Sequence, residues 1–154
     1  MSNLSVQFYG TRGSVPVCDP NYLEFGGNTT CIAIHNHQTG RIGILDAGTG
    51  IRNLGKEILA NYSDQKDIFI MFTHFHWDHI QGFPFFKPAY DSEVELHILT
   101  LGVGREFAGL HDIFAMQMQE IYFPVALENM GCKFNFLEYQ DISALIQGGS
   151  VSSI

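Results

Sequence analysis

The chain has 154 residues, of which 45% are hydrophobic and 16% charged, a composition typical of a folded domain with its own core. The net charge of -8 disfavours a large nucleic-acid partner, which a basic face would bind, but is compatible with a small phosphate ester. No apolar run approaches the length of a membrane span, and the N-terminus lacks the pattern of a signal peptide. Three widely spaced cysteines, Cys18, Cys31 and Cys132, form no CxxC motif, which predicts a cytoplasmic protein without a disulfide framework.

The first third of the chain is rich in strand patterns. Residues 4–10 predict a strand that ends in a glycine turn, and residues 11–27 form a long loop rich in glycine and proline. Residues 28–36 and 41–48 predict two further strands, joined by a turn at 37–40. Together these last two strands predict a hairpin.

Helices and strands then alternate. From residue 49 the apolar positions take a helical period, with Ile51, Leu54, Ile58 and Leu59. Residues 67–72 predict a buried strand, 94–99 another strand, 104–119 a helix and 131–139 a half-exposed strand. This order predicts a layered α/β or α+β domain with a mixed sheet and flanking helices.

The motif THFHWDH, residues 73–79, directly follows the buried strand and carries four side chains of metal-ligand type. In an extended segment His74 and His76 point the same way, whereas Asp78 and His79 follow where the chain turns. Imidazole and carboxylate ligands suit zinc, and also manganese or iron. Two metals held there would carry a hydroxide as nucleophile and polarise an ester or phosphoryl oxygen.

THFHWDH resembles the HxHxDH motif of the metallo-β-lactamase fold hydrolases. FYGTRGSVPV (8–17), FGGNTTCIAI (25–34) and ILDAGTGIRNLG (44–55) resemble a branch similar to tRNA 3′-processing endonucleases and cyclic-phosphate phosphodiesterases. The resemblance implies an αββα sandwich with a dinuclear site between its sheets, and a phosphodiesterase activity. It implies that His74 and His76 bind the first metal, that Asp78 and His79 bind the second, and that Asp78 also positions the nucleophilic water.

The family uses further ligands C-terminal to this motif, and its members run to well over 200 residues. After His79 the chain offers only His97 and His111, in contexts unlike those ligand motifs. Residues 1–154 are therefore interpreted as a partial domain, the N-terminal half of the sandwich, with little activity alone. The apolar sheet face of such a half would be exposed, which predicts a homo-oligomer that covers it.

Two residues outside the motif are candidates for the site. The resemblance places Asp46 near the metals, where it would orient a ligand histidine; the alternative is a cap of the following helix. Arg12, in the loop GTRGS, is a candidate phosphate contact, and a structural glycine turn is the alternative.

Other residues are interpreted as structural. The pair His35 and His37 falls at the hairpin turn, which favours solvent exposure. Trp77 is interpreted as a packing residue, and Asn28 and Thr29 as residues that fix the neighbouring loop. Core positions are predicted for Phe83, Phe85, Phe86, Met116 and Met118.

Three functions remain open at this point. A hydrolase of small phosphodiesters is favoured by the branch resemblance. A hydrolase of lactones, thioesters or β-lactams would use the same fold, which hosts many chemistries. A non-catalytic metal-binding or interaction module is the third.

Overall fold

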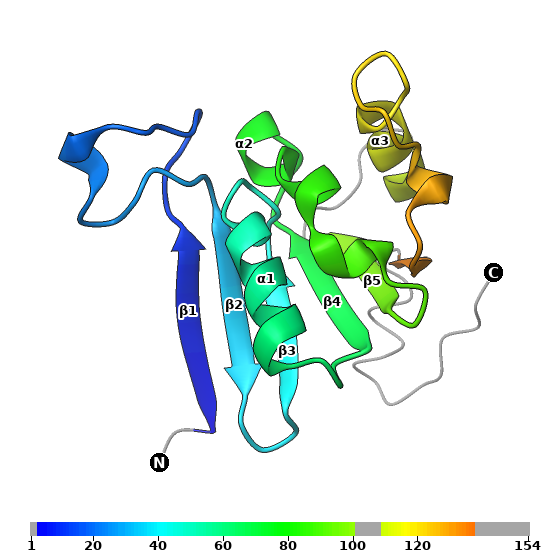
Figure 1. Ribbon diagram of the computed structural model, residues 1–154, viewed down its shortest axis with the longest axis horizontal. Coiled ribbons are helices and arrows are strands. Elements are labelled where there is room, and N and C mark those ends of the chain that lie inside the picture. The colour runs from blue at the N-terminus through cyan, green and yellow to red at the C-terminus, as the bar shows by residue number, and fades with distance from the viewer. Residues whose placement is uncertain (1–2, 101–108, 138–154) are drawn as a thin grey trace.

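The structure is a computed structural model that describes residues 3–100 and 109–137, and these residues form a six-stranded mixed sheet flanked by helices (Figure 1). The strand order follows the chain: β1–β2–β3 pair antiparallel, and β3–β4–β5–β6 pair parallel. The predicted mixed α/β fold is confirmed. The strands are β1 (Leu4–Gly10), β2 (Cys31–Asn36), β3 (Arg41–Leu45), β4 (Asp67–Phe72), β5 (Glu95–Thr100) and β6 (Lys133–Leu137).

The helices are short and lie mostly between β3 and β6 in the chain. The α-helices are α1 (Ile51–Asn61), α2 (Trp77–Ile80) and α3 (Leu110–Gln117). The 3-10 helices are η1 (Pro20–Tyr22), η2 (Phe83–Phe85), η3 (Lys87–Tyr90) and η4 (Leu127–Asn129).

The predicted hairpin of β2 and β3 is closed by polar turn chemistry. The Asn36 side chain accepts hydrogen bonds from the backbone N–H groups of Gln38 and Thr39. Gly40 then adopts a left-handed φ of 71°, which a residue without a Cβ reaches without steric cost, and its N–H donates to the carbonyl of Asn36. This turn fixes the register in which Ile34 faces Gly43.

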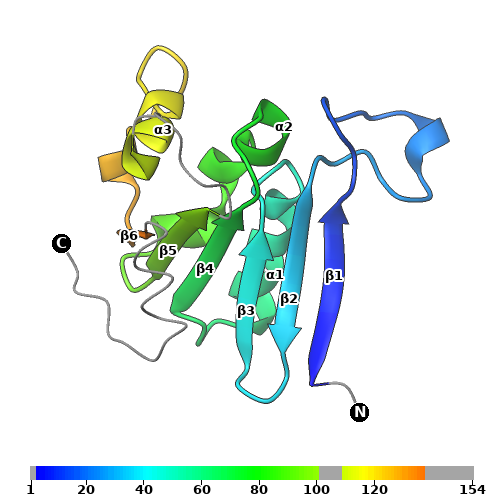
Figure 2. The ribbon, with the colours of Figure 1, turned by 180° about the vertical axis from the view of Figure 1, so that it is seen from behind.

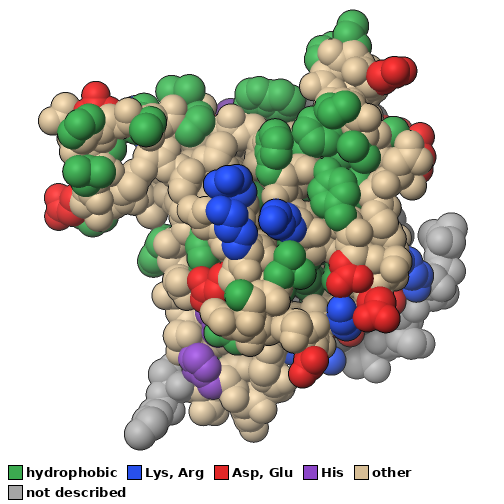
Figure 3. Space-filling model, viewed as in Figure 1, with side chains coloured by type: hydrophobic (Ala, Val, Ile, Leu, Met, Phe, Trp, Pro, Cys, Tyr) green, Lys and Arg blue, Asp and Glu red, His purple; other side chains and the backbone are tan. Residues whose placement is uncertain are grey.

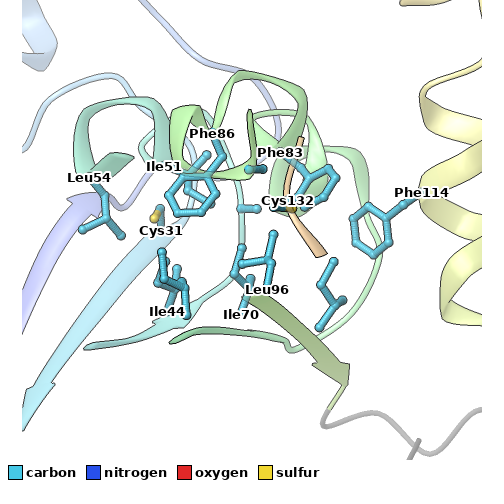
Figure 4. Packing of buried hydrophobic residues seen from close by; sticks show 14 of the residues in the cluster. Cys31, Ile44, Ile51, Leu54, Ile70, Phe83, Phe86, Leu96, Phe114 and Cys132 are labelled. Carbon is cyan, nitrogen blue, oxygen red and sulfur yellow. The ribbon is translucent and has the colours of Figure 1, made fainter. Parts of the chain in front are cut away.

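One face of the sheet carries the hydrophobic core (Figure 4). α1 lies over it and buries Ile51, Leu54 and Ile58 against alternate strand residues such as Ile44 and Ile70. Gly55 lets η3 approach, since a Cβ there would lie 3.0 Å from the ring of Phe86 and 3.1 Å from Pro88. The helical period of the sequence is thus explained by one buried stripe.

Aromatic rings extend this core toward β6. Phe114 of α3 is fully buried, with its ring centroid 5.0 Å from that of Phe72 and 4.5 Å from that of Phe83. The Gln117 amide of the same helix donates to the carbonyl of Ile80 at 2.9 Å. These contacts attach α3 to the segment that follows β4.

The opposite face of the sheet is seen from behind the molecule (Figure 2). In that view α1 lies behind the strands, and none of the described helices crosses in front of β1–β4. Leu4, Val6 and Phe8 of the edge strand β1 are 52%, 55% and 63% exposed. We call this side of the sheet the open face.

Most predicted elements lie within one or two residues of their observed bounds. The first strand of the hairpin begins at Cys31 rather than residue 28, because residues 28–30 form part of a loop that meets Arg12 in an isolated bridge. The helix predicted at 104–119 is observed as Leu110–Gln117, and positions 104–108 lie outside the described residues.

Two predicted core positions, Phe85 and Met116, are wrong, and one apolar position of the predicted helical stripe, Leu59, is exposed. Leu59 is 43% exposed because it lies at the margin of the buried stripe of α1, and Phe85 and Met116 are 54% and 58% exposed at the solvent side of their short helices. Phe83, Phe86 and Met118 are fully buried, as predicted.

The three cysteines are all free. Cys18 is exposed, whereas Cys31 and Cys132 are buried. Among the described residues, no helix has the length and apolar character that crossing a membrane requires.

Close backbone packing joins the loop after β3 to the segment after α2. A Cβ on Gly82 would lie 2.0 Å from the carbonyl oxygen of Gly48, and a Cβ on Gly48 would lie 2.4 Å from the carbonyl oxygen of Asp78. Backbone hydrogen bonds support the contact, since Ala47 donates to the carbonyl of His79 and Gly82 to that of Ala47. These two glycines therefore set the position of α2 against the sheet.

Replacement of Gly82 by alanine is expected to destabilise the fold by about 1–3 kcal/mol, because the new methyl group meets backbone that has no free space to move into. The matched control is Gly13→Ala, where nothing lies within 4 Å of an added Cβ, and where a change within about 0.5 kcal/mol is expected. Urea unfolding followed by circular dichroism measures both. Equal stability of the two variants would contradict this packing argument.

Candidate metal centre

The residues of THFHWDH lie where β4 ends and the chain turns into α2 (Figure 1). His76 is the N-cap of α2 with an extended backbone, and the His79 N–H donates to its carbonyl at 2.9 Å. The predicted change from an extended segment to a turn between His76 and Asp78 is confirmed. The four candidate ligands therefore lie on the short loop after a buried strand, His74 and His76, and in the helix α2 that follows it, Asp78 and His79.

Asp46, at the end of β3, joins this loop to the neighbouring strand. Its side chain is buried and accepts hydrogen bonds from the backbone N–H and the hydroxyl of Thr73, at 2.9 to 3.1 Å. Its Oδ2 also lies 2.8 Å from Nδ1 of His79. α1 has Gly50 at its N-cap, so Asp46 contacts the histidine and does not cap the helix.

The rings of three histidines gather beside Asp46. The centroid of His74 lies 4.5 Å from that of His76 and 4.1 Å from that of His79. Nδ1 of His74 lies 3.0 Å from the hydroxyl of Thr73, as Nδ1 of His79 lies beside Asp46. Both rings thus have one nitrogen engaged with a neighbouring side chain and leave Nε2 as the available ligand atom.

Asp78 is positioned by the loop that follows β1. Its Oδ2 accepts a hydrogen bond from the backbone N–H of Ser14 at 2.8 Å and lies 3.5 Å from Nε2 of His79. Ser14 has a left-handed φ of 71°, uncommon for a residue with a side chain. The loop GTRGS therefore borders the site, as expected, but the contact comes from its backbone.

The local electrostatics favour the protonation states that metal ligands require. Burial, followed by the nearby His79 and His76, lowers the pKa of His74 and so favours its neutral imidazole. The N–H of Ser14 is the main cause that lowers the pKa of Asp78, which stays ionised. A neutral imidazole and a carboxylate are the forms that bind a divalent ion.

The cluster is not a closed coordination sphere. Among residues 3–100 and 109–137, no three histidine, cysteine or acidic side chains already converge on one point as a metal site would require. The donor set nevertheless fits a divalent ion in its chemistry: three imidazoles and a carboxylate, with two rings oriented by a second partner.

Arg12 contacts its own loop. Its Nε donates to the carbonyl of Val15 at 3.1 Å, and its guanidinium lies 4.5 Å from the centroid of the Tyr22 ring. The phosphate contact assigned to Arg12 stays a prediction. Figure 3 shows that the loop projects from the body of the protein and carries hydrophobic side chains; Leu23 and Phe25 are 81% and 77% exposed.

The side chains of Asn28 and Thr29 contact Thr49 rather than the loop GTRGS, which instead meets Asn28 through the backbone N–H of Arg12. The Thr49 hydroxyl donates to Asn28 Oδ1, and Thr49 N–H donates to the Thr29 hydroxyl at 2.8 Å. Sequence reasoning overlooked Thr73 and Ser14, which contact His74 and Asp78. The only sequence feature that could have identified these two residues is their position next to residues already considered. Thr73 directly precedes the first histidine of the motif, and Ser14 lies in the same loop as Arg12.

Two other interpretations from the sequence are wrong. His35 is buried, 6% exposed, because it lies on the core side of β2, where its ring packs 5.6 Å from that of Tyr62. Trp77 is 61% exposed, because it begins α2 on the solvent side. His37 is exposed, as expected, with Nε2 2.8 Å from the hydroxyl of Ser5.

The two later histidines have acidic neighbours outside the motif. His97 lies in β5, and its Nε2 is 2.9 Å from Asp67. His111 lies in α3, and its Nδ1 is 3.2 Å from Asp112.

Comparisons with known proteins place the chain only broadly. No protein-family model matches the sequence, and no curated protein matches it. Its structure is similar to that of a Thermotoga maritima protein provisionally described as a metallo-β-lactamase, with a TM-score of 0.41 and 16% sequence identity over 89% of this chain. This chain spans 60% of the length of that protein. At this level of similarity the match assigns neither a substrate nor a metal to the chain.

The replacement Asp46→Asn is expected to weaken zinc binding by about 10- to 100-fold, since it removes the negative charge beside His79. Asparagine also tolerates the left-handed φ of 58° at this position, so the backbone is preserved. Competition with a chromophoric chelator measures the affinity, and Asp112→Asn on α3 is the exposed control. An unchanged affinity in Asp46→Asn would show that the carboxylate does not orient a ligand.

Ser14→Pro is expected to raise the pKa of Asp78 toward its ordinary value, because proline has no N–H to donate and cannot adopt the left-handed φ of 71° that brings this backbone to the carboxylate. Ser14→Gly keeps the N–H and the left-handed backbone, so the pKa should stay low. Carboxyl carbon NMR of the metal-free protein measures both. In the parent protein, the lowered pKa of Asp78 stabilises the folded state at pH values above the pKa of this carboxyl in the unfolded chain. That stabilisation is lost as the pH falls through the pKa of Asp78 in the folded protein. An equal pKa of Asp78 in the two variants would contradict the conclusion that the N–H of Ser14 lowers it.

Proposed function

We propose that His74, His76, Asp78 and His79 bind divalent metal and that the chemistry of the site is metal-dependent hydrolysis. The observation that carries this proposal is the pairing of the ligands with orienting groups: Asp46 holds Nδ1 of His79, and Thr73 lies at Nδ1 of His74. Histidines in metal sites typically have this second partner, which fixes the tautomer that presents Nε2. Surface histidines gathered by chance would not need a buried carboxylate.

The ligands divide between two positions in the proposed dinuclear site. His74 and His76 would bind one ion, and Asp78 and His79 the other, most simply zinc, with manganese or iron as alternatives. A bound ion would act as a Lewis acid and lower the pKa of a water molecule. Small rotations of the histidine side chains would be needed to close the ligands on an ion, since no three of them converge as they stand among the described residues.

The protein's own groups would then perform positioning and proton chemistry. Asp78, kept ionised by the N–H of Ser14, would accept a hydrogen bond from the attacking water and orient it. Asp46 would hold His79 through the reaction, since its carboxylate is fixed by Thr73. The backbone of the loop after β1 would border the substrate.

The proposed substrate is a small phosphodiester. The support is the resemblance of FYGTRGSVPV and FGGNTT to the phosphodiesterase branch, together with the acidic net charge of -8, which disfavours a long nucleic acid. Hydrolysis of a lactone, thioester or β-lactam is the alternative within the fold. A non-catalytic metal-binding or interaction module is the alternative outside enzymes.

Metal binding provides the first test. His76→Ala should weaken zinc binding at least about tenfold, since it removes a ligand, whereas His37→Ala should leave it unchanged. His37 is a matched control because it also belongs to an HxH pair but lies exposed at the hairpin. Equal zinc affinity of the two variants would contradict the proposal that His76 belongs to a metal site.

A substrate panel then separates the functions. With zinc or manganese added, hydrolysis of bis(p-nitrophenyl) phosphate that His76→Ala abolishes would support the phosphodiesterase, and turnover confined to lactones would support the alternative. Little turnover is expected from the 154 residues without further ligands. If the protein binds metal but hydrolyses none of these substrates, even when a partner protein supplies further metal ligands, the result would favour the non-catalytic module.

A further inference from the structure

Exposed hydrophobic side chains gather at the same edge of the protein as the motif THFHWDH. Three separate segments supply them: the projecting loop at residues 11–27, the first residue of α2, and the turn that follows α3. In both ribbon views α2 lies between the other two segments, at the edge where β4 ends (Figure 1, Figure 2). Figure 3 shows hydrophobic side chains along this edge. The six residues, which we call the apolar edge, are each between 57% and 81% exposed: Val15, Leu23, Phe25, Trp77, Ile121 and Tyr122.

The tip of the projecting loop is folded back on itself. The N–H of Val17 donates to the carbonyl of Gly27 at 3.0 Å. The two backbones approach so closely that a Cβ on Gly27 would lie 1.8 Å from the carbonyl oxygen of Val17. The tip therefore begins and ends at one point of the fold, and Leu23 and Phe25 are exposed on a closed tip rather than on an extended chain.

The turn after α3 is held at its base by an aromatic contact. The ring of Phe123 lies edge-on to that of Phe85 with a centroid distance of 5.5 Å. The N–H groups of Tyr122 and Phe123 both donate to the carbonyl of Gln119, at 2.8 and 2.9 Å. With Phe123 packed inward, the two preceding residues, Ile121 and Tyr122, stand at the outside of the turn.

We propose that the apolar edge docks on the surface of a zwitterionic lipid bilayer. Its residues stand apart on two projections and one helix end, and a lipid surface deforms around each of them. Leucine, isoleucine and phenylalanine enter the boundary of the acyl chains, whereas Trp77 and Tyr122 are residue types enriched at the level of the headgroups. Exposed apolar groups of this extent mark an interaction site. The docking requires no membrane span, since it uses residues from three segments far apart in the chain.

The charges beside the apolar edge favour zwitterionic lipids over anionic lipids. Asp19 and Glu24 lie in the projecting loop, and Glu120 directly precedes the exposed residues of the turn after α3; all three are exposed. An anionic membrane has a negative surface potential, which attracts basic segments and repels these carboxylates. The outermost group of a phosphocholine headgroup is instead a quaternary ammonium, which carboxylates attract. The partner of complementary chemistry is therefore a phosphatidylcholine surface.

Docking would bring the candidate metal site to the layer of the headgroups, each of which contains a phosphodiester. This step rests on the proposed function, whose substrate class would then be a phospholipid. Hydrolysis would break one P–O bond of the diester and divide the elements of water between the two products. Docking itself requires neither metal nor turnover, so it can hold or fail independently of the proposed hydrolase.

The fluorescence of Trp77 tests the docking directly, because this residue is the single tryptophan of the chain. Phosphatidylcholine vesicles are titrated into the protein, with and without zinc. The emission is expected to shift to shorter wavelength and to be quenched when the vesicles contain brominated phosphatidylcholine. Vesicles with added phosphatidylglycerol should bind more weakly. The absence of shift and quenching, or binding that requires phosphatidylglycerol, would overturn the proposal.

Variants test which residues make the contact. Leu23→Ser in the projecting loop and Ile121→Ser in the turn after α3 should each weaken flotation with phosphatidylcholine vesicles by at least about threefold, because each removes apolar surface that lipid would bury. Leu59→Ser is the matched control and should leave flotation unchanged, since Leu59 is exposed in the last turn of α1, away from this edge (Figure 1). Circular dichroism verifies the fold of each variant. Equal flotation of the three variants would contradict the docking.

Sedimentation velocity without lipid separates this proposal from self-association. A second copy of the chain on the apolar edge would appear as a dimer that Leu23→Ser dissociates. Such a dimer, together with no binding to vesicles, would overturn the proposal of a lipid surface.

Discussion

The carboxylate of Asp46 is the interaction on which the candidate site depends. It lies at the end of β3, binds the backbone and hydroxyl of Thr73 at the end of β4, and contacts His79 in α2. Three separate segments are thus joined at one buried side chain. Without that junction the backbone hydrogen bond from Ala47 to His79 would still hold α2 near the sheet, but the His79 ring would lose the carboxylate that orients it.

The carboxylate of Asp46 can be buried because its oxygen atoms accept hydrogen bonds from neighbouring groups. Burial of a carboxylate is costly unless donors surround it, and Asp46 has two from Thr73 and an imidazole nitrogen of His79. Its left-handed backbone, unusual outside glycine and asparagine or aspartate, turns the side chain toward these donors. Asp46 and the candidate ligand His79 therefore belong to one structural unit.

The sequence predicts the elements well because each has a local signal. The helical period after residue 49 reflects one buried stripe, and the apolar run at residues 67–72 reflects a strand of the core, so local patterns record both. In residues 4–10 the alternation marks a strand whose apolar side chains Leu4, Val6 and Phe8 are exposed. The contacts of the site are not local: Ser14 and Asp78 are 64 positions apart, and Asp46 and His79 are 33 apart. Burial of His35 likewise depends on Tyr62, which the hairpin sequence does not contain. The ligand types were predictable from one motif, whereas their orienting partners required the fold.

The close approach of Gly48 and Gly82 has a consequence for how such a site can diversify. Neither position has space for a methyl group, and the carbonyl of Asp78 lies directly against Gly48. Substitution is therefore restricted at this contact beside the candidate site, whereas the exposed side chains Leu23 and Phe25 of the projecting loop at residues 11–27 are free of that restriction. The close packing at Gly48 and Gly82 would thus preserve the positions of the candidate ligands, whereas the exposed loop tolerates substitution.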